Sequence, residues 1–296
     1  MRDIVIIGSG PAGLTAGIYG VRAGLDVCII DSSPVSGGQI LNTYEVDNYP
    51  GLPGISGVMM GETFRKHCEK LGVEFITATV KSVEKMADGF VVKTRKEEIL
   101  TKNVILATGA SNKKLGVPGE EEFSGMGVSY CATCDGAFFK DKTVAVIGGG
   151  DVAVEDAIYL ARGSKKVYLI HRRDEFRAAK ILVDEAKSCS NIEMVLNTVV
   201  DEIVGTDAVN SVLMTNKISG EKTTIDLDGV FIAVGTEPNS ALYKGLCDLD
   251  EKGYVIAGED CKTSTEGLYA AGDVRTKKLR QVITACADGA NAVSAI

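Results

Sequence analysis

Two cysteines, Cys131 and Cys134, stand two residues apart and form the only closely spaced pair among the eight cysteines of the sequence. Thiols at this spacing at the start of a helix can close into a small disulfide ring. A helix N-terminus stabilises a thiolate and lowers the pKa of its cysteine. One sulfur can then attack a partner's disulfide while the other resolves the mixed disulfide. The pair therefore predicts thiol–disulfide exchange.

Half of a zinc site is the alternative interpretation of such a pair. A zinc site needs a second pair of ligands, and the sequence offers only His67 and Cys68, which are adjacent to each other and far from the first pair. The spacing therefore disfavours a metal site. The other six cysteines are isolated, which is typical of small buried apolar side chains.

An apolar strand, a glycine-rich turn, a helix and a second strand occur twice in the sequence. The first copy has its strand at residues 4–7 and its turn at 8–13, and the second has them at 144–147 and 148–153. This order is a βαβ unit with a dinucleotide-binding fingerprint, in which phosphates lie at the positive end of the helix. In each copy the three small residues permit a tight turn, close approach to a pyrophosphate and helix–strand packing, in the order Gly8, Gly10 and Gly13, then Gly148, Gly150 and Ala153.

The two copies differ in charge at the end of the second strand. The first copy has Asp31 there, whereas the second has His171, followed by Arg172 and Arg173 and by Arg177 nearby. A carboxylate accepts hydrogen bonds from ribose hydroxyls and repels a 2′-phosphate, and basic side chains do the reverse. The first site is therefore predicted to bind FAD or NAD, and the second NADP. A solvated run of charges is the alternative for the basic residues.

The repeated βαβ units predict an α/β fold, with domain boundaries near residues 112–117 and 240–245. Helices are predicted at 56–71 and 280–296. The first nucleotide-binding domain is then discontinuous, and the second is inserted into it.

The sequence resembles the low-molecular-weight bacterial thioredoxin reductases, which are FAD-dependent pyridine nucleotide-disulfide oxidoreductases, over nearly its whole length. The motifs that carry the resemblance are, in chain order, Gly8-Ser9-Gly10-Pro11-Ala12-Gly13, Gly37-Gly38-Gln39, Asn48-Tyr49-Pro50-Gly51, Ala107-Thr108-Gly109, Cys131-Ala132-Thr133-Cys134-Asp135-Gly136, His171-Arg172-Arg173 with Arg177, Ala271-Gly272-Asp273-Val274 and Arg280-Gln281-Val282.

The resemblance implies two Rossmann-like nucleotide-binding domains. An FAD-binding domain would comprise residues 1–114 and 243–296, and the inserted NADPH-binding domain, residues 115–242, would carry the redox disulfide. It further implies a homodimer, a thioredoxin or thioredoxin-like protein as substrate, and rotation of the inserted domain between two arrangements. The function implied is transfer of electrons from NADPH through FAD and the disulfide to thioredoxin.

The resemblance also assigns roles to residues. Cys134 would be the flavin-proximal sulfur, Cys131 the sulfur that attacks the substrate, and Asp135 the acid that moves a proton. FAD would be bound by Gly8, Gly10, Pro11, Ala12, Gly13, Asp31, Gly38, Gln39, Asn48, Ala107, Thr108, Gly109, Gly272, Asp273, Arg280, Gln281 and Val282. NADPH would be bound by Gly148, Gly150, Asp151, Val152, Ala153, His171, Arg172, Arg173 and Arg177.

Val152 departs from the family pattern, because a serine usually stands at this position. Loss of a hydroxyl that can bind a phosphate costs about 1 kcal/mol. This change leaves room for a reductase fed by ferredoxin or another donor, or for a flavin dithiol oxidase, although the arginine cluster counts against both. A ferredoxin–NADP reductase of the same fold would have no use for the cysteine pair, and a non-enzymatic redox sensor would not explain two nucleotide fingerprints.

Overall charge and the first residues narrow the function classes. The net charge of −8 argues against a protein that binds nucleic acid or a membrane surface. The sequence enters an apolar strand at residue 4, which leaves no room for a signal peptide, and no apolar run is long enough to span a bilayer. We therefore expect a cytoplasmic protein without structural disulfides.

Overall fold

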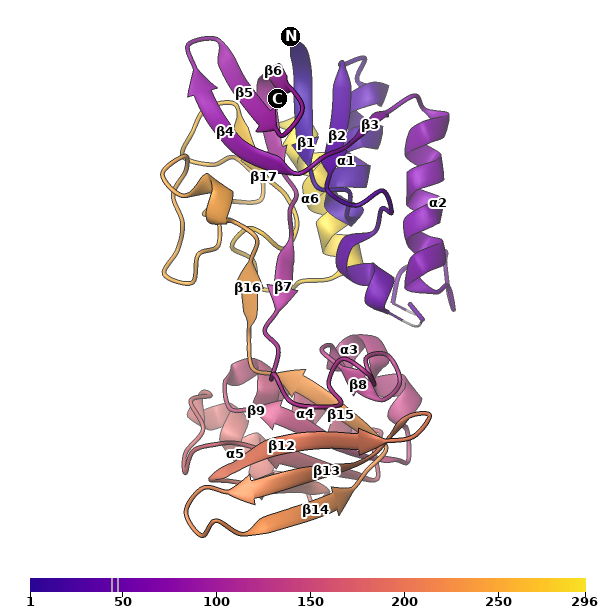
Figure 1. The fold of residues 1–296 in the computed structure, drawn as a ribbon, viewed down its shortest axis with the longest axis vertical. Helices are drawn as coiled ribbons and strands as arrows, with labels where there is room; N and C mark the ends of the chain where they lie inside the picture. Colours follow the sequence, from indigo (N-terminus) through magenta and orange to yellow (C-terminus); the bar gives the residue numbers. More distant parts are fainter. Residues whose placement is uncertain (44, 47) are drawn as a thin grey trace. The chain divides into compact units, whose positions relative to one another are not determined.

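A computed structural model of the chain describes residues 1–43, 45–46 and 48–296. The chain forms two compact units (Figure 1). Unit 1 comprises Met1–Ser111 and Glu237–Ile296, and unit 2 comprises Asn112–Thr236. Both units are of mixed α/β type, so the predicted fold class is confirmed.

The main sheet of unit 1 has seven strands in the order β3–β2–β1–β6–β5–β4, and β17 also pairs with β6. The strands β1, β2, β3, β6 and β17 run parallel, whereas β4 and β5 form antiparallel pairs that end at β6. The strand bounds are β1 (Arg2–Ile7), β2 (Val27–Asp31), β3 (Glu74–Thr77), β4 (Val80–Met86), β5 (Gly89–Thr94), β6 (Glu98–Leu106) and β17 (Leu268–Ala270).

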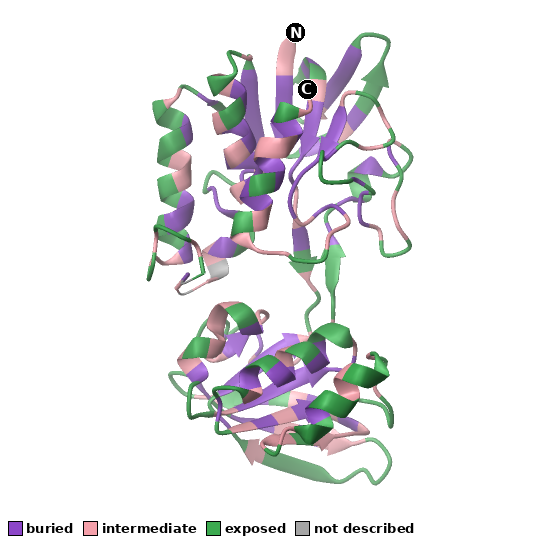
Figure 2. Cartoon of the chain, turned by 180° about the vertical axis from the view of Figure 1, so that it is seen from behind, coloured by how far each residue is buried: buried purple, intermediate pink, exposed green. Residues whose placement is uncertain are grey.

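The described part of unit 1 contains the α-helices α1 (Pro11–Arg22), α2 (Gly57–Lys70) and α6 (Val282–Ser294) and the 3-10 helices η1 (Gly38–Asn42) and η3 (Ala241–Tyr243). The helices predicted at 56–71 and 280–296 are therefore present. The first of them begins after Ser56, whose Oγ accepts a hydrogen bond from the N–H of Met59 at 3.3 Å. Helices α1 and α6 pack closely, since a Cβ added at Gly289 would lie 2.2 Å from the carbonyl oxygen of Ala12. Figure 2 shows that the helices bury one face and expose the other.

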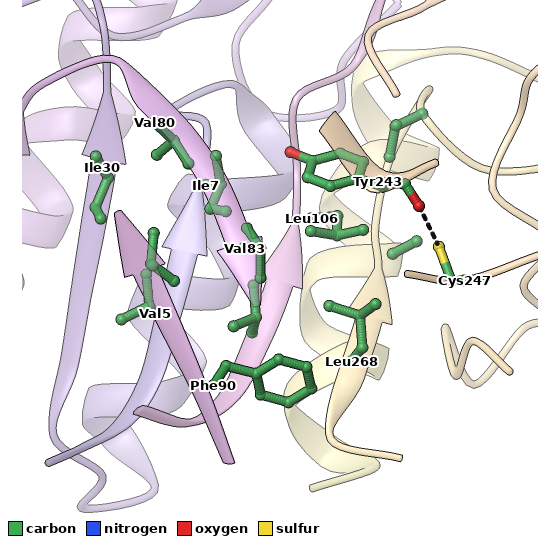
Figure 3. Close-up of a cluster of buried hydrophobic side chains, with 14 of the residues drawn as sticks. Val5, Ile7, Ile30, Val80, Val83, Phe90, Leu106, Tyr243, Cys247 and Leu268 are labelled. Carbon is green, nitrogen blue, oxygen red and sulfur yellow. Dashed lines mark hydrogen bonds between the residues drawn. The ribbon is translucent and has the colours of Figure 1, made fainter. Parts of the chain in front are cut away.

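The core of unit 1 lies on both faces of the parallel strands. Along β1, Ile4 and Ile6 pack with residues of α1 and α6, whereas Val5 and Ile7 pack on the opposite face with residues of β4 and β5. Figure 3 shows the second cluster, which also includes Phe90. A strand buried on both faces appears in the sequence as a continuous apolar run, which explains the apolar run at residues 4–7.

Unit 2 contains a parallel sheet of five strands in the order β11–β10–β9–β15–β8 and an antiparallel sheet of three strands in the order β12–β13–β14. The strand bounds are β8 (Val128–Ser129), β9 (Thr143–Gly148), β10 (Lys166–Ile170), β11 (Ile192–Val195), β12 (Thr198–Gly205), β13 (Val209–Asn216), β14 (Lys222–Asp226) and β15 (Gly229–Ala233). Its helices are α3 (Ala132–Asp135), α4 (Asp151–Ala161) and α5 (Lys180–Ser188).

The strand β9 is also buried on both faces. Val144 and Val146 pack with residues of α4, and Ala145 and Ile147 pack with residues of the three-stranded sheet. This strand leads into the second glycine-rich turn, as β1 leads into the first. The short strands β7 (Ala110–Asn112) and β16 (Thr236–Pro238), where the chain passes between the units, pair with each other. No helix among the described residues is long and apolar enough to cross a membrane.

Candidate functional site

Cys131 and Cys134 are joined by a disulfide, as predicted, with their Cα atoms 5.3 Å apart. Cys131 has an extended backbone and is the N-cap of α3, so its carbonyl oxygen accepts hydrogen bonds from the N–H groups of Cys134 at 3.3 Å and Asp135 at 3.1 Å. The helix is a single turn, and a 3-10 turn at Gly136–Phe139 follows it. Because few peptide dipoles are aligned in one turn, the helix stabilises a thiolate less than a full-length helix would.

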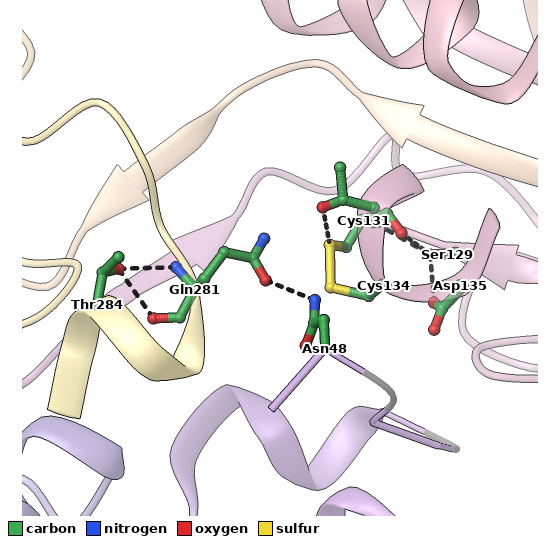
Figure 4. The surroundings of a disulfide bond; sticks show 8 residues. Asn48, Ser129, Cys131, Cys134, Asp135, Gln281 and Thr284 are labelled. Atoms are coloured by element: carbon green, nitrogen blue, oxygen red, sulfur yellow. Dashed lines mark hydrogen bonds between the residues drawn. A yellow bond between two sulfur atoms is a disulfide. The ribbon is translucent and has the colours of Figure 1, made fainter. Parts of the chain in front are cut away.

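Asp135 directly follows Cys134, and its carboxyl is held by Ser129, the last residue of β8 (Figure 4). The Ser129 hydroxyl donates to Oδ2 of Asp135 at 2.5 Å and accepts from the N–H of Cys131 at 3.0 Å. Oδ1 of Asp135 is buried and has no hydrogen-bond partner among the described residues. Burial raises the pKa of Asp135 above its usual value, against the opposing effect of the Ser129 hydrogen bond. A carboxyl whose pKa is raised in this way holds its proton more readily than an exposed one, which suits a proton-transfer group.

The disulfide engages both sulfurs, so neither cysteine is a thiolate that could bind zinc. Among residues 1–43, 45–46 and 48–296, no cluster of three or more His, Cys, Asp or Glu side chains is placed to hold a metal ion. Cys68 of the alternative ligand pair is buried, and its thiol donates to the carbonyl oxygen of Leu14 at 3.2 Å.

The first glycine-rich turn has the geometry that a bound pyrophosphate requires. Gly8 has φ of +108°, and a Cβ there would lie 2.3 Å from the carbonyl oxygen of Ala107. A Cβ at Gly13 would lie 1.9 Å from the carbonyl oxygen of Gly8. By contrast, a Cβ at Gly10 would meet no atom closer than 3.9 Å. Gly10 is the N-cap of α1, and no side chain caps the helix, so its first N–H groups suit a phosphate.

Asp31 lies at the end of β2, beside this turn. Its Oδ2 accepts two hydrogen bonds from Ser9, one from the N–H and one from the hydroxyl, both at 2.7 Å. Its Oδ1 accepts from the N–H of Ser33 at 2.9 Å. The carboxylate is therefore fixed in orientation, and Oδ1 can still accept a ribose hydroxyl. Ser9 is buried and tied to Asp31, a role that the sequence analysis did not recognise.

Segments far apart in the sequence meet at the first turn. A Cβ at Gly38 would lie 3.5 Å from the Cα of Gly10, and one at Gly272 would lie 3.0 Å from the Cβ of Ala12. Residues 38 and 272 therefore lie close to the first fingerprint.

The other residues predicted to bind FAD are held in place by hydrogen bonds or helix position. Gln39 Nε2 donates to the carbonyl oxygen of Ala110, and Thr108 Oγ1 donates to the carbonyl oxygen of Asn239 at 2.7 Å. Asn48 Nδ2 donates to Gln281 Oε1 at 3.0 Å, and Val282 is the first residue of α6. Gly109 has a φ of +67°.

Two polar atoms near Gly272 lack protein partners. Oδ1 of Asp273 and Nε of Arg280 are both buried without a hydrogen bond among the described residues. An unpaired buried polar atom costs about 1–3 kcal/mol, so both atoms suit a ligand that carries hydroxyl or phosphate groups. Burial raises the pKa of Asp273, although the charges of Lys277 and Arg280 oppose this. These unpaired atoms fit a dinucleotide such as the FAD or NAD that the first fingerprint predicts.

A buried ion cluster that the sequence analysis missed holds the segment containing Gly272 and Asp273. Asp288 of α6 is 4% exposed, and it accepts hydrogen bonds from the N–H of Gly272 at 2.9 Å and from Nζ of Lys277 at 2.8 Å. Arg275 also donates to it twice. An aspartate within an otherwise apolar helix pattern was the signal that could have indicated this anchor.

The second glycine-rich turn repeats the geometry of the first. A Cβ at Gly148 would lie 2.4 Å from the carbonyl oxygen of Ala233 and 2.6 Å from the Cβ of Ala153, whereas a Cβ at Gly150 would meet no atom within 4 Å. Gly150 is the N-cap of α4, which again has no side-chain cap. Asp151 Oδ1 accepts from the N–H of Ala179 at 2.8 Å. The turn is therefore open where a phosphate would approach.

The basic cluster of the second site divides into a buried and an exposed part. His171 is 5% exposed, and its ring stacks on Phe176 and lies against Gly149, where a Cβ would come within 2.1 Å of it. Burial, more than the neighbouring arginine charges, lowers the pKa of His171. The ring is therefore neutral, and the positive charge of the cluster comes from the exposed side chains of Arg172, Arg173 and Arg177.

Position 152 stands in the first turn of α4. Its valine side chain is 62% exposed, so the departure from the family pattern lies at the open end of the helix. The backbone around the turn is fixed from another side, because the N–H of Arg177 donates to the carbonyl oxygen of Gly149 at 2.7 Å.

Known proteins resemble the chain over almost its full length. The profile of the pyridine nucleotide-disulphide oxidoreductase family matches residues 2–289. The thioredoxin reductase of Peptoclostridium acidaminophilum is 44% identical, with 99% of this chain and 95% of that protein covered. The crystal structure of thioredoxin reductase from Streptococcus pyogenes is 46% identical with a TM-score of 0.95, covering 99% of this chain and 96% of that one. Thioredoxin reductase from Giardia duodenalis is 36% identical with a TM-score of 0.93 over 99% and 96% of the two chains. The chain therefore belongs to the pyridine nucleotide-disulphide oxidoreductase family and, within it, to the thioredoxin reductases.

Proposed function

We propose that this protein is an NADPH-dependent thioredoxin-disulfide reductase that passes two electrons through FAD to the Cys131–Cys134 disulfide and then to a thioredoxin. The observation that carries the proposal is the disulfide itself, which is followed directly by the half-buried carboxyl of Asp135 in a unit that also holds a nucleotide fingerprint. The relatives named thioredoxin reductase support the identity of the substrate.

FAD is proposed to bind the domain formed by residues 1–114 and 243–296. The open backbone at Gly10, the fixed carboxylate of Asp31 and the unpaired Oδ1 of Asp273 would hold its pyrophosphate and its hydroxyls. When bound, FAD would supply the electron pair that opens the disulfide. The remaining FAD contacts are proposed for the residues that the family motifs identify.

NADPH is proposed to bind the domain formed by residues 115–242. The backbone at Gly150 would hold the pyrophosphate, and Arg172, Arg173 and Arg177 would attract the 2′-phosphate that distinguishes NADPH from NADH. The neutral ring of His171, which lies against Gly149 and stacks on Phe176, would support the backbone of the turn.

The two sulfurs are proposed to act in sequence on thioredoxin. The thiolate of Cys131 attacks the thioredoxin disulfide, which forms a mixed disulfide and releases one thioredoxin thiolate. The thiolate of Cys134 then displaces the second thioredoxin sulfur, and the Cys131–Cys134 bond forms again. The enzyme loses two electrons and thioredoxin gains them, so the exchange is balanced. Asp135 moves a proton to or from a sulfur during these steps.

The proposed assembly is a homodimer that works in the reducing cytosol on a thioredoxin or thioredoxin-like protein. Sedimentation of the flavin-loaded protein would test the dimer.

Anaerobic titration of the flavin-loaded protein tests the donor. NADPH should bleach the flavin absorbance at one equivalent, and NADH should do so only at much higher concentration. Bleaching by reduced ferredoxin but not by NADPH would contradict the proposal and favour the alternative donor that Val152 leaves open. Arg173→Ala should lose affinity for NADPH. Lys165→Ala, which alters an exposed cation outside the cluster, is the matched control and should leave the NADPH affinity unchanged.

Cysteine variants test the route to thioredoxin. Cys134→Ser should abolish thioredoxin reduction while NADPH still bleaches the flavin, because the break falls after the flavin. Cys189→Ser alters a cysteine outside the disulfide and should keep full activity. Full thioredoxin turnover by Cys134→Ser would rule out the disulfide as the electron carrier.

A further inference from the structure

Ser129 stands at the end of β8 and belongs to no motif used above. It pairs with Phe231 of β15 and is 6% exposed, so the parallel sheet of unit 2 fixes its backbone. Its Oγ lies between the backbone of Cys131 and the carboxyl of Asp135, as Figure 4 shows. A buried hydroxyl thus joins the redox segment to its acid.

The direction of these hydrogen bonds follows from the atoms involved. The N–H of Cys131 can only donate, so the Ser129 oxygen accepts it at 3.0 Å. The single hydroxyl proton then points to Oδ2 of Asp135 at 2.5 Å, since the carbonyl oxygen of Cys131 lies farther away, at 3.4 Å. Oδ2 is therefore engaged, and Oδ1, which is buried without a partner among the described residues, is the oxygen available for proton exchange.

We propose that Ser129 is a positioning residue for disulfide reduction: its hydroxyl orients the Asp135 carboxyl so that Oδ1 exchanges the proton with the sulfurs. This inference rests on the proposed function. An electron pair entering the disulfide breaks the S–S bond and leaves two thiolates. One thiolate takes the proton of the Asp135 carboxylic acid, which gives a thiol and a carboxylate. When the dithiol later reduces thioredoxin, the carboxylate takes a proton back from the thiol that must become a nucleophile.

The electrostatic surroundings of Asp135 agree with this role. Burial raises its pKa and the Ser129 hydrogen bond lowers it, and these two influences account for the shift. Tyr130, which directly follows Ser129, has its pKa raised above the usual value by burial and by its hydrogen bond to Glu120. Helix α4 packs against α3 and carries Glu155 and Asp156, and the pKa of Asp156 is raised to about 7. A pH profile of this site must therefore separate Asp135 from Asp156.

Ser129→Ala in the flavin-loaded enzyme is the first test. The donor to Oδ2 is lost, so the pKa of Asp135 should rise, and the acidic limb of thioredoxin reduction should move up by about one pH unit. The value of kcat should fall roughly tenfold, with little change in the KM for thioredoxin, because a proton-transfer step and not binding is affected. NADPH should bleach the flavin as in the unaltered enzyme.

Matched variants separate positioning from structure. Ser164→Ala removes another buried hydroxyl of the same unit and should leave the pH profile unchanged. Asp156→Asn identifies any limb that belongs to Asp156. In an Asp135→Asn background, Ser129→Ala should have no further effect on kcat, because Ser129 acts only through Asp135. If the alanine variant fails to fold, Ser129→Thr and Ser129→Val replace it, since both favour a strand and only threonine keeps the hydroxyl.

The outcomes distinguish this inference from the proposed function. An unaltered pH profile in Ser129→Ala or Ser129→Val, with normal thioredoxin turnover, overturns the role of Ser129 and leaves the proposed function intact. Additive losses in the double variant also overturn it. Failure of the unaltered enzyme to be reduced by NADPH or to reduce thioredoxin would instead overturn the proposed function.

Discussion

Arg275 and Asp288 form a bidentate ion pair in the interior of unit 1, with Nη2 at 2.7 Å from Oδ1 and Nε at 2.9 Å from Oδ2. Both side chains are at least nine-tenths buried, at 10% and 5% exposure. Burial raises the pKa of Asp288, but the hydrogen bonds from Arg275 and Lys277 outweigh it and hold the pKa below its usual value. Asp288 also accepts a hydrogen bond from the N–H of Gly272, so the ion pair links the stability of unit 1 to the proposed flavin site.

Asp288→Ala should destabilise unit 1 strongly, because it leaves two buried cations without their partner. Breaking one side of a buried ion pair costs about 3–5 kcal/mol. The N–H of Gly272 loses its acceptor as well, so flavin should be released at a lower urea concentration. Urea unfolding followed by flavin fluorescence measures both effects. Lys66→Ala breaks the exposed pair with Glu62 and should leave the midpoint unchanged. Equal midpoints for the two variants would contradict the anchoring role of Asp288.

Asp156 should make the stability of unit 2 depend on pH. Burial, and then the charge of Glu155, raises its pKa from 3.8 to about 7. The folded state therefore binds this proton more tightly than the unfolded state does. The resulting stability is complete below pH 3.8 and is lost as the pH rises towards 7.

Asp156→Asn is neutral at every pH and escapes this loss. Relative to the unaltered protein, the free energy of unfolding of this variant should therefore increase by ~1.4 kcal/mol for each unit that the pH rises between about 4 and 7. Urea unfolding at several pH values would measure the difference. A difference that stays constant over this range would show that Asp156 does not titrate as its burial implies.

Glu120 fixes the segment that precedes the disulfide. It is 1% exposed and accepts hydrogen bonds from the N–H groups of Leu115 at 2.8 Å and Gly116 at 2.6 Å and from the Tyr130 hydroxyl at 2.7 Å. Although burial raises the pKa of Glu120, these donors hold it below its usual value. Residues on both sides of the carboxylate are thus joined in unit 2.

Tyr130→Phe should destabilise unit 2 by about 1.5 kcal/mol, the contribution of a hydrogen bond to a charged group. Glu120→Ala should cost more, since it leaves three donors without their acceptor. Chemical unfolding monitored by circular dichroism would give both values. Tyr159→Phe removes the hydroxyl of a tyrosine that is 39% exposed and serves as the control. Equal stability of all three variants would argue against a structural role for the Glu120 carboxylate.

Val152→Ser should tighten the binding of both NADPH and NADH. The new hydroxyl lies in the first turn of α4, where the pyrophosphate common to both nucleotides is proposed to bind, and one hydrogen bond contributes about 1 kcal/mol, or several-fold in affinity. Val152→Ala shortens the side chain without adding a hydroxyl and should give no gain. Dissociation constants from flavin or nucleotide fluorescence would decide. A gain confined to NADPH would place the hydroxyl near the 2′-phosphate instead.

The features that the sequence predicted correctly are local. The runs at residues 4–7 and 144–147 are buried on both faces, and the glycines that follow them have neighbours that exclude a Cβ at Gly8, Gly13 and Gly148. The apolar run and the glycine spacing lie within one βαβ unit and leave a regular pattern along the chain, although the carbonyl groups that crowd Gly8 and Gly148 belong to the distant residues Ala107 and Ala233. The spacing of Cys131 and Cys134 is equally local, and the disulfide forms across one helical turn.

The features that the sequence did not reveal depend on distant partners. His171 follows the second strand in the same way as Asp31 does, yet it packs beneath Gly149 instead of facing solvent. Asp288 appears as a polar interruption of an apolar helix until Arg275 is placed beside it. Ser129 gains its role only once β8 enters the sheet next to β15. In each case tertiary packing decides whether a polar residue is solvated or engaged, and spacing alone carries no record of it.

The order in which the two units can complete their folding follows from the discontinuity of unit 1. Its sheet needs β17, and its first helix needs α6, so neither can be completed before the last segment of the chain, Glu237–Ile296, has left the ribosome. Unit 2 is continuous, so it can fold before β17 and α6, which unit 1 requires, have been synthesised. The part that carries the cysteine pair is therefore expected to mature first during translation, and a nascent chain arrested before residue 268 would expose an incomplete sheet for a chaperone to bind.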